Sequence, residues 1–114
     1  MSKPRRDNDY LSDILEAMQR IMAYTKDLSY EQFISNVMAQ DATIRNLQVI
    51  GEAAKKLSQS VRSIYPDIRW REMAGMRDKI VHEYFGVNLE VVWEVARKDI
   101  PQLSALIGDI LRER

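Results

Sequence analysis

Residues 7–25, DNDYLSDILEAMQRIMAYT, repeat apolar side chains at steps of three and four residues. The repeating positions are Leu11, Ile14, Leu15, Met18, Ile21 and Met22. This spacing lines up one apolar stripe along an amphipathic helix and leaves polar side chains around the rest of its surface. The segment therefore predicts a helix that buries one face against other helices.

A second helix is expected to begin at Ser29, because a serine with a glutamine three residues later has the spacing of a capping box. The apolar periodicity falters near Gln40, where we expect this helix to break or kink. It resumes strongly and continues to Ile64. Pro66 then ends the helix, since the residue before a proline is pushed away from helical angles.

Two further helical patterns complete the chain. One runs from Trp70 to Phe85, with Gly86 as a C-terminal cap, and the next follows an expected N-cap at Asn88. Pro101 either interrupts this last pattern or occupies the first turn of a new helix. No alternating pattern predicts a strand, so we expect an all-α fold, an antiparallel bundle of four to five helices. Residues 1–114 would form a single domain, with residues 1–6 as a flexible arm.

Composition narrows the classes of protein that fit. The chain has 114 residues, enough for one core, and 17 basic residues balance 17 acidic ones, so no global positive field attracts nucleic acid. It lacks cysteine, which excludes disulfides and thiolate ligands and suits a reducing cytoplasm. No apolar stretch follows the basic N-terminus or approaches the ~20 residues that span a bilayer. We expect a cytoplasmic protein without a membrane segment.

The stretch Arg77-Asp78-Lys79-Ile80-Val81-His82-Glu83-Tyr84 contains the only histidine of the chain. At about 100° per residue, Arg77 and His82 lie roughly 140° apart around a helix, so an ideal helix does not aim both at one point. Either the helix loosens at its end, or another surface completes the site. Asp78 lies one turn before His82, where its carboxylate could orient the imidazole.

An arginine and a histidine together suit metal-free cleavage of RNA, in which the 2′-hydroxyl attacks its own phosphate. The guanidinium binds phosphate oxygens through a planar fork, and the imidazole transfers protons near neutral pH. One histidine supplies only one of the two proton-transfer groups, whereas a symmetric dimer would present two copies of Arg77 and His82 across a shared cleft. Short patterns of this kind also arise by chance on surface helices.

These residues carry a resemblance. Arg77 to Tyr84 reads R-x-x-x-x-H-x-Y, which resembles the signature of the HEPN superfamily in its HepT-like branch. Ile50-Gly51-Glu52-Ala53, preceded by Arg45, is similar to a second motif of that branch. The resemblance spans nearly the whole chain. It implies an all-α homodimer that dimerises through its helices, acts as a ribonuclease toxin on an RNA substrate, and has Arg77 and His82 at the dimer cleft.

The resemblance also implies a partner. In this family an MntA-type nucleotidyltransferase acts as antitoxin by transferring AMP to the motif tyrosine, which is Tyr84 here. Asp78, Glu52 and Arg45 would have supporting roles, with Glu52 meeting a cation such as Arg45 or Arg77. No cofactor is implied, and the single histidine lacks the spacing of a metal site.

Two alternatives stay open at this point. The chain could be a nucleotide-binding regulatory subunit of a nucleotidyltransferase, or a plain helical dimerisation module. The basic residues Arg69, Arg71, Arg77 and Lys79 could follow a phosphate backbone, yet the acidic residues Asp67, Glu72, Asp78 and Glu83 alternate with them. The six methionines and the rings of Trp70 and Trp93 are expected in the core or at a dimer interface.

Overall fold

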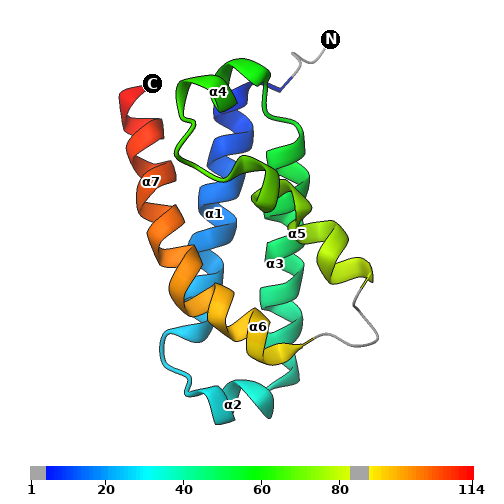
Figure 1. Ribbon diagram of the computed structural model, residues 1–114. Coiled ribbons are helices and arrows are strands. Elements are labelled where there is room, and N and C mark those ends of the chain that lie inside the picture. Colours follow the sequence, from blue (N-terminus) through cyan, green and yellow to red (C-terminus); the bar gives the residue numbers. More distant parts are fainter. Residues whose placement is uncertain (1–4, 83–87) are drawn as a thin grey trace.

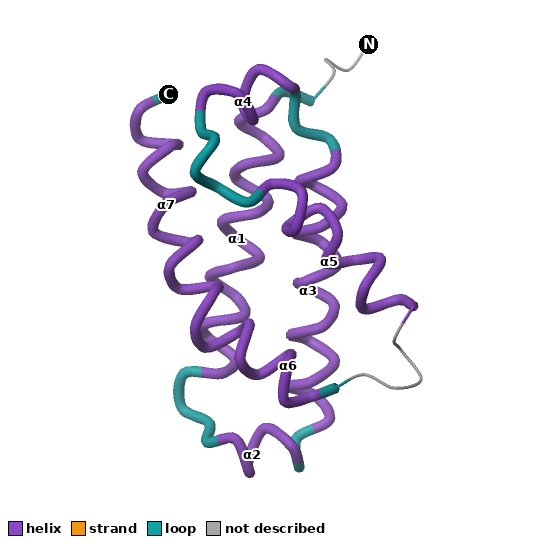
Figure 2. Tube along the Cα trace, viewed as in Figure 1, coloured by secondary structure: helices purple, strands orange, loops and turns teal. Residues whose placement is uncertain are grey.

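The computed structural model describes residues 5–82 and 88–114, with the backbone alone for residues 77–82, and every regular element in these ranges is helical (Figures 1 and 2). In chain order the elements are α1 (Asp7–Thr25), α2 (Tyr30–Ile34), α3 (Val37–Lys55), α4 (Gln59–Ile64), α5 (Trp70–His82), α6 (Leu89–Glu94), a π-helical turn η2 (Val95–Asp99) and α7 (Ile100–Glu113).

The long helices form an antiparallel bundle, as the sequence predicts. Helices α1 and α3 pack side by side at its centre, α7 covers α1, and α5 covers α3 (Figure 1). The short helices α2 and α4 lie at opposite ends of the bundle. Within the described ranges, no helix is both long enough and apolar enough to cross a membrane.

The apolar stripe predicted for residues 7–25 forms the centre of the core. Leu11, Ile14, Met18 and Ile21 are fully buried, whereas Leu15 and Met22 are half-buried at the edge of the stripe. Burial of each such side chain stabilises the fold by about 1.5–3 kcal/mol relative to its exposure to water. The packing of α1 against its neighbours therefore explains why this segment is a single uninterrupted helix.

The break expected near Gln40 occurs earlier in the chain. Helix α2 ends at Ile34, and Asn36 caps α3 by accepting a hydrogen bond from the Ala39 N–H at 2.9 Å. Gln40 itself is inside α3, where its side-chain amide donates to the carbonyls of Phe33 and Ile34 at 2.9 and 2.8 Å. The polar side chain that interrupts the apolar pattern thus satisfies the carbonyl end of the preceding helix.

A second interruption was not expected. The sequence predicts one helix up to Ile64, but α3 ends at Lys55 and Ser58 caps a separate helix, α4. The Asp7 carboxylate accepts hydrogen bonds from the Ser58 N–H at 2.9 Å and the Ser58 hydroxyl at 2.6 Å. Arg62 of α4 donates to the Ala54 carbonyl at 2.8 Å, which satisfies the end of α3. The predicted continuous helix is therefore wrong, because contacts across the bundle stabilise the break.

Pro101 lies in the first turn of α7, as one of the two alternatives from the sequence predicts. The backbone passes from α6 through the turn η2 into α7 with helical dihedral angles at both junctions. Proline lacks the N–H that would bond to Arg97 four residues earlier, and its ring crowds that carbonyl. The wider π-helical turn just before Pro101 accommodates this clash and keeps the segment continuous.

Candidate functional site

Helix α5 carries three of the predicted site residues. Its N-terminal half is fixed by Trp70, which is buried and donates from its ring N–H to the Tyr65 carbonyl at 2.9 Å, and by the buried Met73. The helix continues from there through Arg77 and Asp78 to His82, its last residue. The positions of all three are therefore set by a helix anchored at one end to the core.

The sequence left two alternatives for Arg77 and His82: either the helix loosens at its end, or another surface completes the site. The helical backbone decides between them. Since α5 stays helical to His82, its end does not loosen between Arg77 and His82. These two positions remain about 140° apart around the helix axis, whereas Asp78 and His82 lie one turn apart on the same side. The side chains of Arg77, Asp78 and His82, and the whole of Tyr84, lie outside the described residues.

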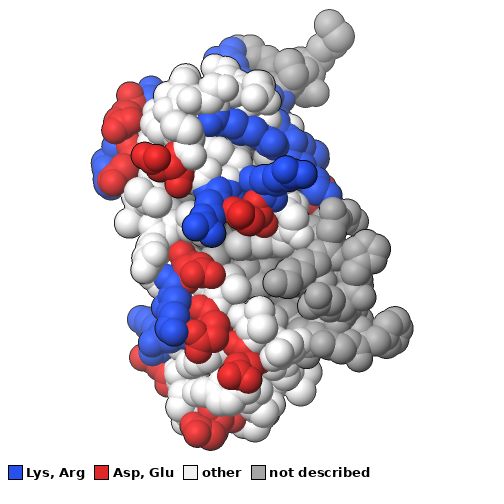
Figure 3. Space-filling model, viewed as in Figure 1, with Lys and Arg blue, Asp and Glu red and all other residues white. Residues whose placement is uncertain are grey.

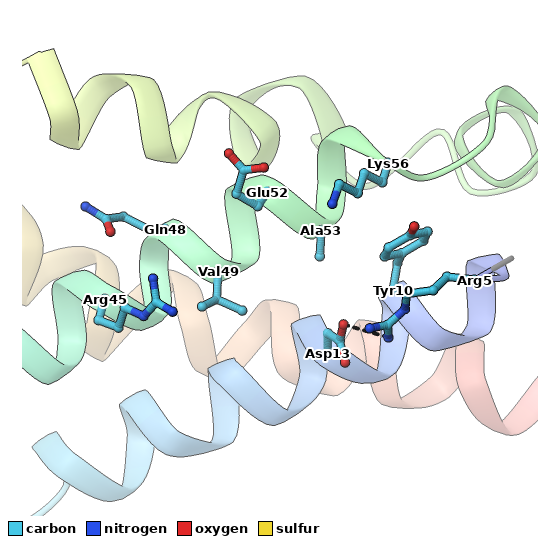
Figure 4. A pocket seen from close by; sticks show the side chains of 9 residues that line it. All are labelled: Arg5, Tyr10, Asp13, Arg45, Gln48, Val49, Glu52, Ala53 and Lys56. Carbon is cyan, nitrogen blue, oxygen red and sulfur yellow. Dashed lines mark ion pairs between the residues drawn. The ribbon is translucent and has the colours of Figure 1, made fainter. Parts of the chain in front are cut away.

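The two supporting residues on α3 face one hollow. Arg45 and Glu52 lie two turns apart on α3, with Gln48 and Val49 between them, and all four line a hollow of about 430 Å³ on the side of the bundle (Figure 4). Arg45 is exposed, and Glu52 is half-buried. Glu52 therefore lies on a polar wall and not inside an apolar stripe. Its pairing with Arg45 or Arg77 stays a prediction.

The opposite wall of this hollow comes from α1 and the residues just before it. Arg5 forms an ion pair of 2.8 Å with Asp13, and its guanidinium lies 5.1 Å from the centre of the Tyr10 ring (Figure 4). The ammonium group of Lys56, from the end of α3, lies 5.9 Å from the same ring centre. Arg5, expected in the N-terminal arm, is thus held against α1.

The hollow combines cationic and aromatic groups. Arg5, Arg45 and Lys56 outweigh the carboxylates of Asp13 and Glu52 by one charge. Guanidinium and ammonium groups bind phosphate oxygens, and an aromatic ring such as that of Tyr10 can stack on a base. Arg5, Tyr10 and Lys56 were not predicted from the sequence as site residues. A polar stripe at positions 45, 48, 52 and 56 could have indicated one wall, but only helix packing brings α1 to it.

The charged residues at the start of α5 form a mixed surface. Arg69 and Arg71 are exposed, and so are Asp67 and Glu72 on either side of them in the sequence. On the face shown in Figure 3, several basic side chains adjoin one another over the upper part of the molecule, with acidic side chains beside them. Acidic residues thus flank this part of the predicted basic run. Among the side chains that the structure describes, no three of His, Cys, Asp or Glu are grouped as ligands for one metal ion.

Known proteins resemble this chain over most of its length. A family model described as "Ribonuclease HepT-like" matches residues 14–110. A Methanocaldococcus jannaschii protein named "Putative RNase MJ0125" is 46% identical over 96% of both chains. A Thermococcus cleftensis protein named "Probable ribonuclease HepT" is 44% identical over 88% of this chain and 91% of its own length. No solved structure matches the chain significantly.

Proposed function

The chain belongs to the Ribonuclease HepT-like family and is a ribonuclease, and from this premise we propose that it is the toxin of a toxin–antitoxin pair. In this proposal it is a metal-independent endoribonuclease that acts as a homodimer. An MntA-type nucleotidyltransferase silences it by transferring AMP to Tyr84.

The helical backbone of α5 through His82 is the observation that carries this proposal. A regular helix separates the positions of Arg77 and His82 by about 140°, so one copy of α5 does not direct both toward a single phosphate. A second copy related by a twofold axis supplies another arginine and another histidine to the same cleft. The dimer would thus provide both proton-transfer groups from a chain that has one histidine.

Each residue has a defined role in the proposed reaction. Arg77 binds the scissile phosphate and stabilises the extra negative charge of the phosphorane. One imidazole removes the proton of the 2′-hydroxyl as that oxygen forms a bond to phosphorus. The other donates a proton to the leaving 5′-oxygen as its bond to phosphorus breaks, which gives a 2′,3′-cyclic phosphate and a 5′-hydroxyl.

Supporting groups would position these two residues and the RNA. Asp78, one turn before His82, would hold the imidazole in its reactive orientation. Arg45 and Lys56 line a hollow on the neighbouring helix and would bind phosphates that flank the cleaved bond. Modification of Tyr84 then has a direct effect on this site. Transfer of AMP from ATP to the phenol oxygen, with release of pyrophosphate, adds a phosphate that competes with RNA for Arg77.

The test compares RNA cleavage by wild type, Arg77→Ala and His82→Ala, each purified without the antitoxin. Both variants should lose about 100-fold or more in rate, because a positioned proton-transfer group and a group that stabilises transition-state charge each contribute on that scale. Arg71→Ala is the matched control, since Arg71 is an exposed arginine on the same helix and outside the motif. Chelator should leave the wild-type rate unchanged.

Three results would count against the proposal. Intact RNA after incubation with unmodified, dimeric wild type would exclude the proposed nuclease mechanism. Equal cleavage by His82→Ala would exclude His82 as a proton-transfer group. A wild-type mass that does not increase by AMP after incubation with ATP and the nucleotidyltransferase, or an equal increase on Tyr84→Phe, would exclude the proposed mode of silencing.

A further inference from the structure

The hollow between α1 and α3 positions two of its basic side chains around one aromatic ring. The guanidinium of Arg5 is fixed by its ion pair of 2.8 Å with Asp13 and lies over the ring of the half-buried Tyr10. The ammonium group of Lys56 lies 5.9 Å from the centre of the same ring. Each cation is attracted by the π electrons of the ring, which restricts two otherwise mobile side chains. The hollow is therefore a built group of side chains and not a scatter of surface charges.

This group has the chemistry of a site for an unpaired nucleotide. The Arg5 guanidinium and the Tyr10 ring both offer flat surfaces on which a base can stack, and such stacking tolerates every base. The ammonium group of Lys56 binds a phosphate oxygen as a compact point charge. The volume of the hollow, about 430 Å³, falls within the range of roughly 300–1,000 Å³ that is typical of sites for small organic ligands. One nucleotide of a longer strand thus suits the hollow in both size and chemistry.

Helix α3 connects this hollow to the helix that carries Arg77 and His82. Arg45 and Lys56 lie at the two ends of the hollow, about 16 Å apart along the axis of α3. Helix α5 packs beside α3 and runs antiparallel to it, so the end of α5 at His82 lies nearer to Arg45 than to Lys56 (Figures 1 and 4). A strand whose cleaved bond lies at that end of α5 would pass Arg45 before it reaches Lys56.

We propose that the hollow is a subsite for an unpaired nucleotide of the RNA, away from the cleaved bond, and that it makes single-stranded RNA the substrate class. The base stacks on the Arg5 guanidinium and the Tyr10 ring, and its phosphate binds Lys56. Arg45 binds a phosphate between this nucleotide and the cleaved bond. The inference rests on the function proposed above. A base inside a duplex is covered on both faces by its neighbours, so it cannot stack on these two groups.

The experiment measures binding of an RNA of about 12 nucleotides, a length typical of single-strand sites, to wild type and to Tyr10→Leu. The RNA carries 2′-O-methyl groups, which remove the attacking hydroxyl and prevent cleavage. Tyr10→Leu keeps apolar packing but lacks the ring, so we expect it to weaken binding at least about fivefold, the scale of one stacked base. Tyr24→Leu is the matched control, because Tyr24 is a partly exposed tyrosine on the same helix and outside the hollow. The same RNA annealed to its complement should bind more weakly and equally to all three proteins.

A second variant tests the phosphate contact. Lys56→Gln should lower the dependence of log Kd on log salt concentration by about 0.7, the contribution of one phosphate contact to a single strand. Lys26→Gln is the matched control, since Lys26 and Lys56 are both exposed lysines at the C-terminal ends of long helices. Because Lys56 is exposed, this variant keeps the proposal testable even if Tyr10→Leu folds poorly.

The outcomes separate the subsite from the nuclease. Wild type that cleaves RNA, with equal binding of the single strand by Tyr10→Leu and Lys56→Gln, would overturn the subsite and leave the proposed nuclease intact. Duplex RNA bound as tightly as the single strand would overturn the substrate class. A monomeric Tyr10→Leu would assign the hollow to the dimer interface and overturn the subsite. Wild type that neither binds nor cleaves any RNA would overturn the subsite together with the proposed function.

Discussion

At the scale of single residues, Asp7 connects the start of α1 to the start of α4. Its two carboxylate oxygens accept from the N–H and the hydroxyl of Ser58, and the same hydroxyl accepts from the Val61 N–H at 3.3 Å. The hydroxyl of Ser58 is the main cause that lowers the pKa of Asp7; partial burial opposes it, and the Ser58 N–H and Arg114 add to the lowering. One carboxylate thus stabilises the N-terminal ends of two helices.

We predict that Asp7→Asn lowers the free energy of unfolding by about 1 kcal/mol at neutral pH, because the amide offers one acceptor for two donors and the side chain is partly exposed. A lowered pKa in the folded state stabilises the protein above the ordinary pKa of the carboxyl, and this contribution is lost as the pH falls through the folded value. The difference between wild type and variant should therefore shrink in acid. Urea unfolding at several pH values measures it.

A double-mutant cycle provides the control for this prediction. Ser58→Ala and Asp7→Asn should not be additive, because both variants remove the hydrogen bond between the Ser58 hydroxyl and the Asp7 carboxylate. Additive losses would show that Asp7 acts through the helix dipole alone.

The contact between Asp7 and Ser58 could not be predicted from the sequence. Ser29 and Asn88 were identified as caps because their partners are two or three residues away, whereas Asp7 and Ser58 are joined only by the fold.

At the scale of elements, α2 depends on contacts made by neighbouring helices. It has five residues, too few for a stable isolated helix. Phe33 packs beneath α2 against Trp93, and the side-chain amide of Gln40 in α3 donates hydrogen bonds to the last carbonyls of α2. Local periodicity indicated a break near Gln40, a few residues after the observed one at residues 35–36, and it did not indicate the break at residues 56–58. Each break is stabilised by a side chain from another element, which periodicity does not contain.

We predict that Gln40→Ala unfolds α2 locally, because two carbonyls lose their donor while the core remains intact. Hydrogen exchange of the α2 amides should accelerate by about tenfold, which corresponds to roughly 1.4 kcal/mol, and global unfolding should change less. Gln19→Ala, at an exposed position of α1, is the control. Unchanged exchange in α2 would mean that Phe33 alone holds this helix.

At the scale of the whole molecule, the hollow beside α3 combines residues that the sequence indicates with residues that only the fold brings to it. Arg45 and Glu52 line one wall of the hollow, since they lie seven residues apart on one helix. The second wall was missed, because the register of α1 against α3 brings Arg5 and Tyr10 to it. The angle between Arg77 and His82 is a property of one helix, and it makes dimerisation the decisive property of the proposed enzyme.

We predict that activity follows the square of the wild-type fraction when wild type and His82→Ala are co-expressed. If a cleft needs both histidines, an equal mixture that pairs at random retains about a quarter of the wild-type activity, because only wild-type homodimers cleave RNA. Independent protomers would instead retain about half. Native mass spectrometry of differently tagged chains verifies random pairing, and wild type mixed with Arg71→Ala controls for tagging. Retention of half the activity, or a monomeric mass by light scattering, would contradict a shared cleft. Either result would mean that a single chain provides the whole site.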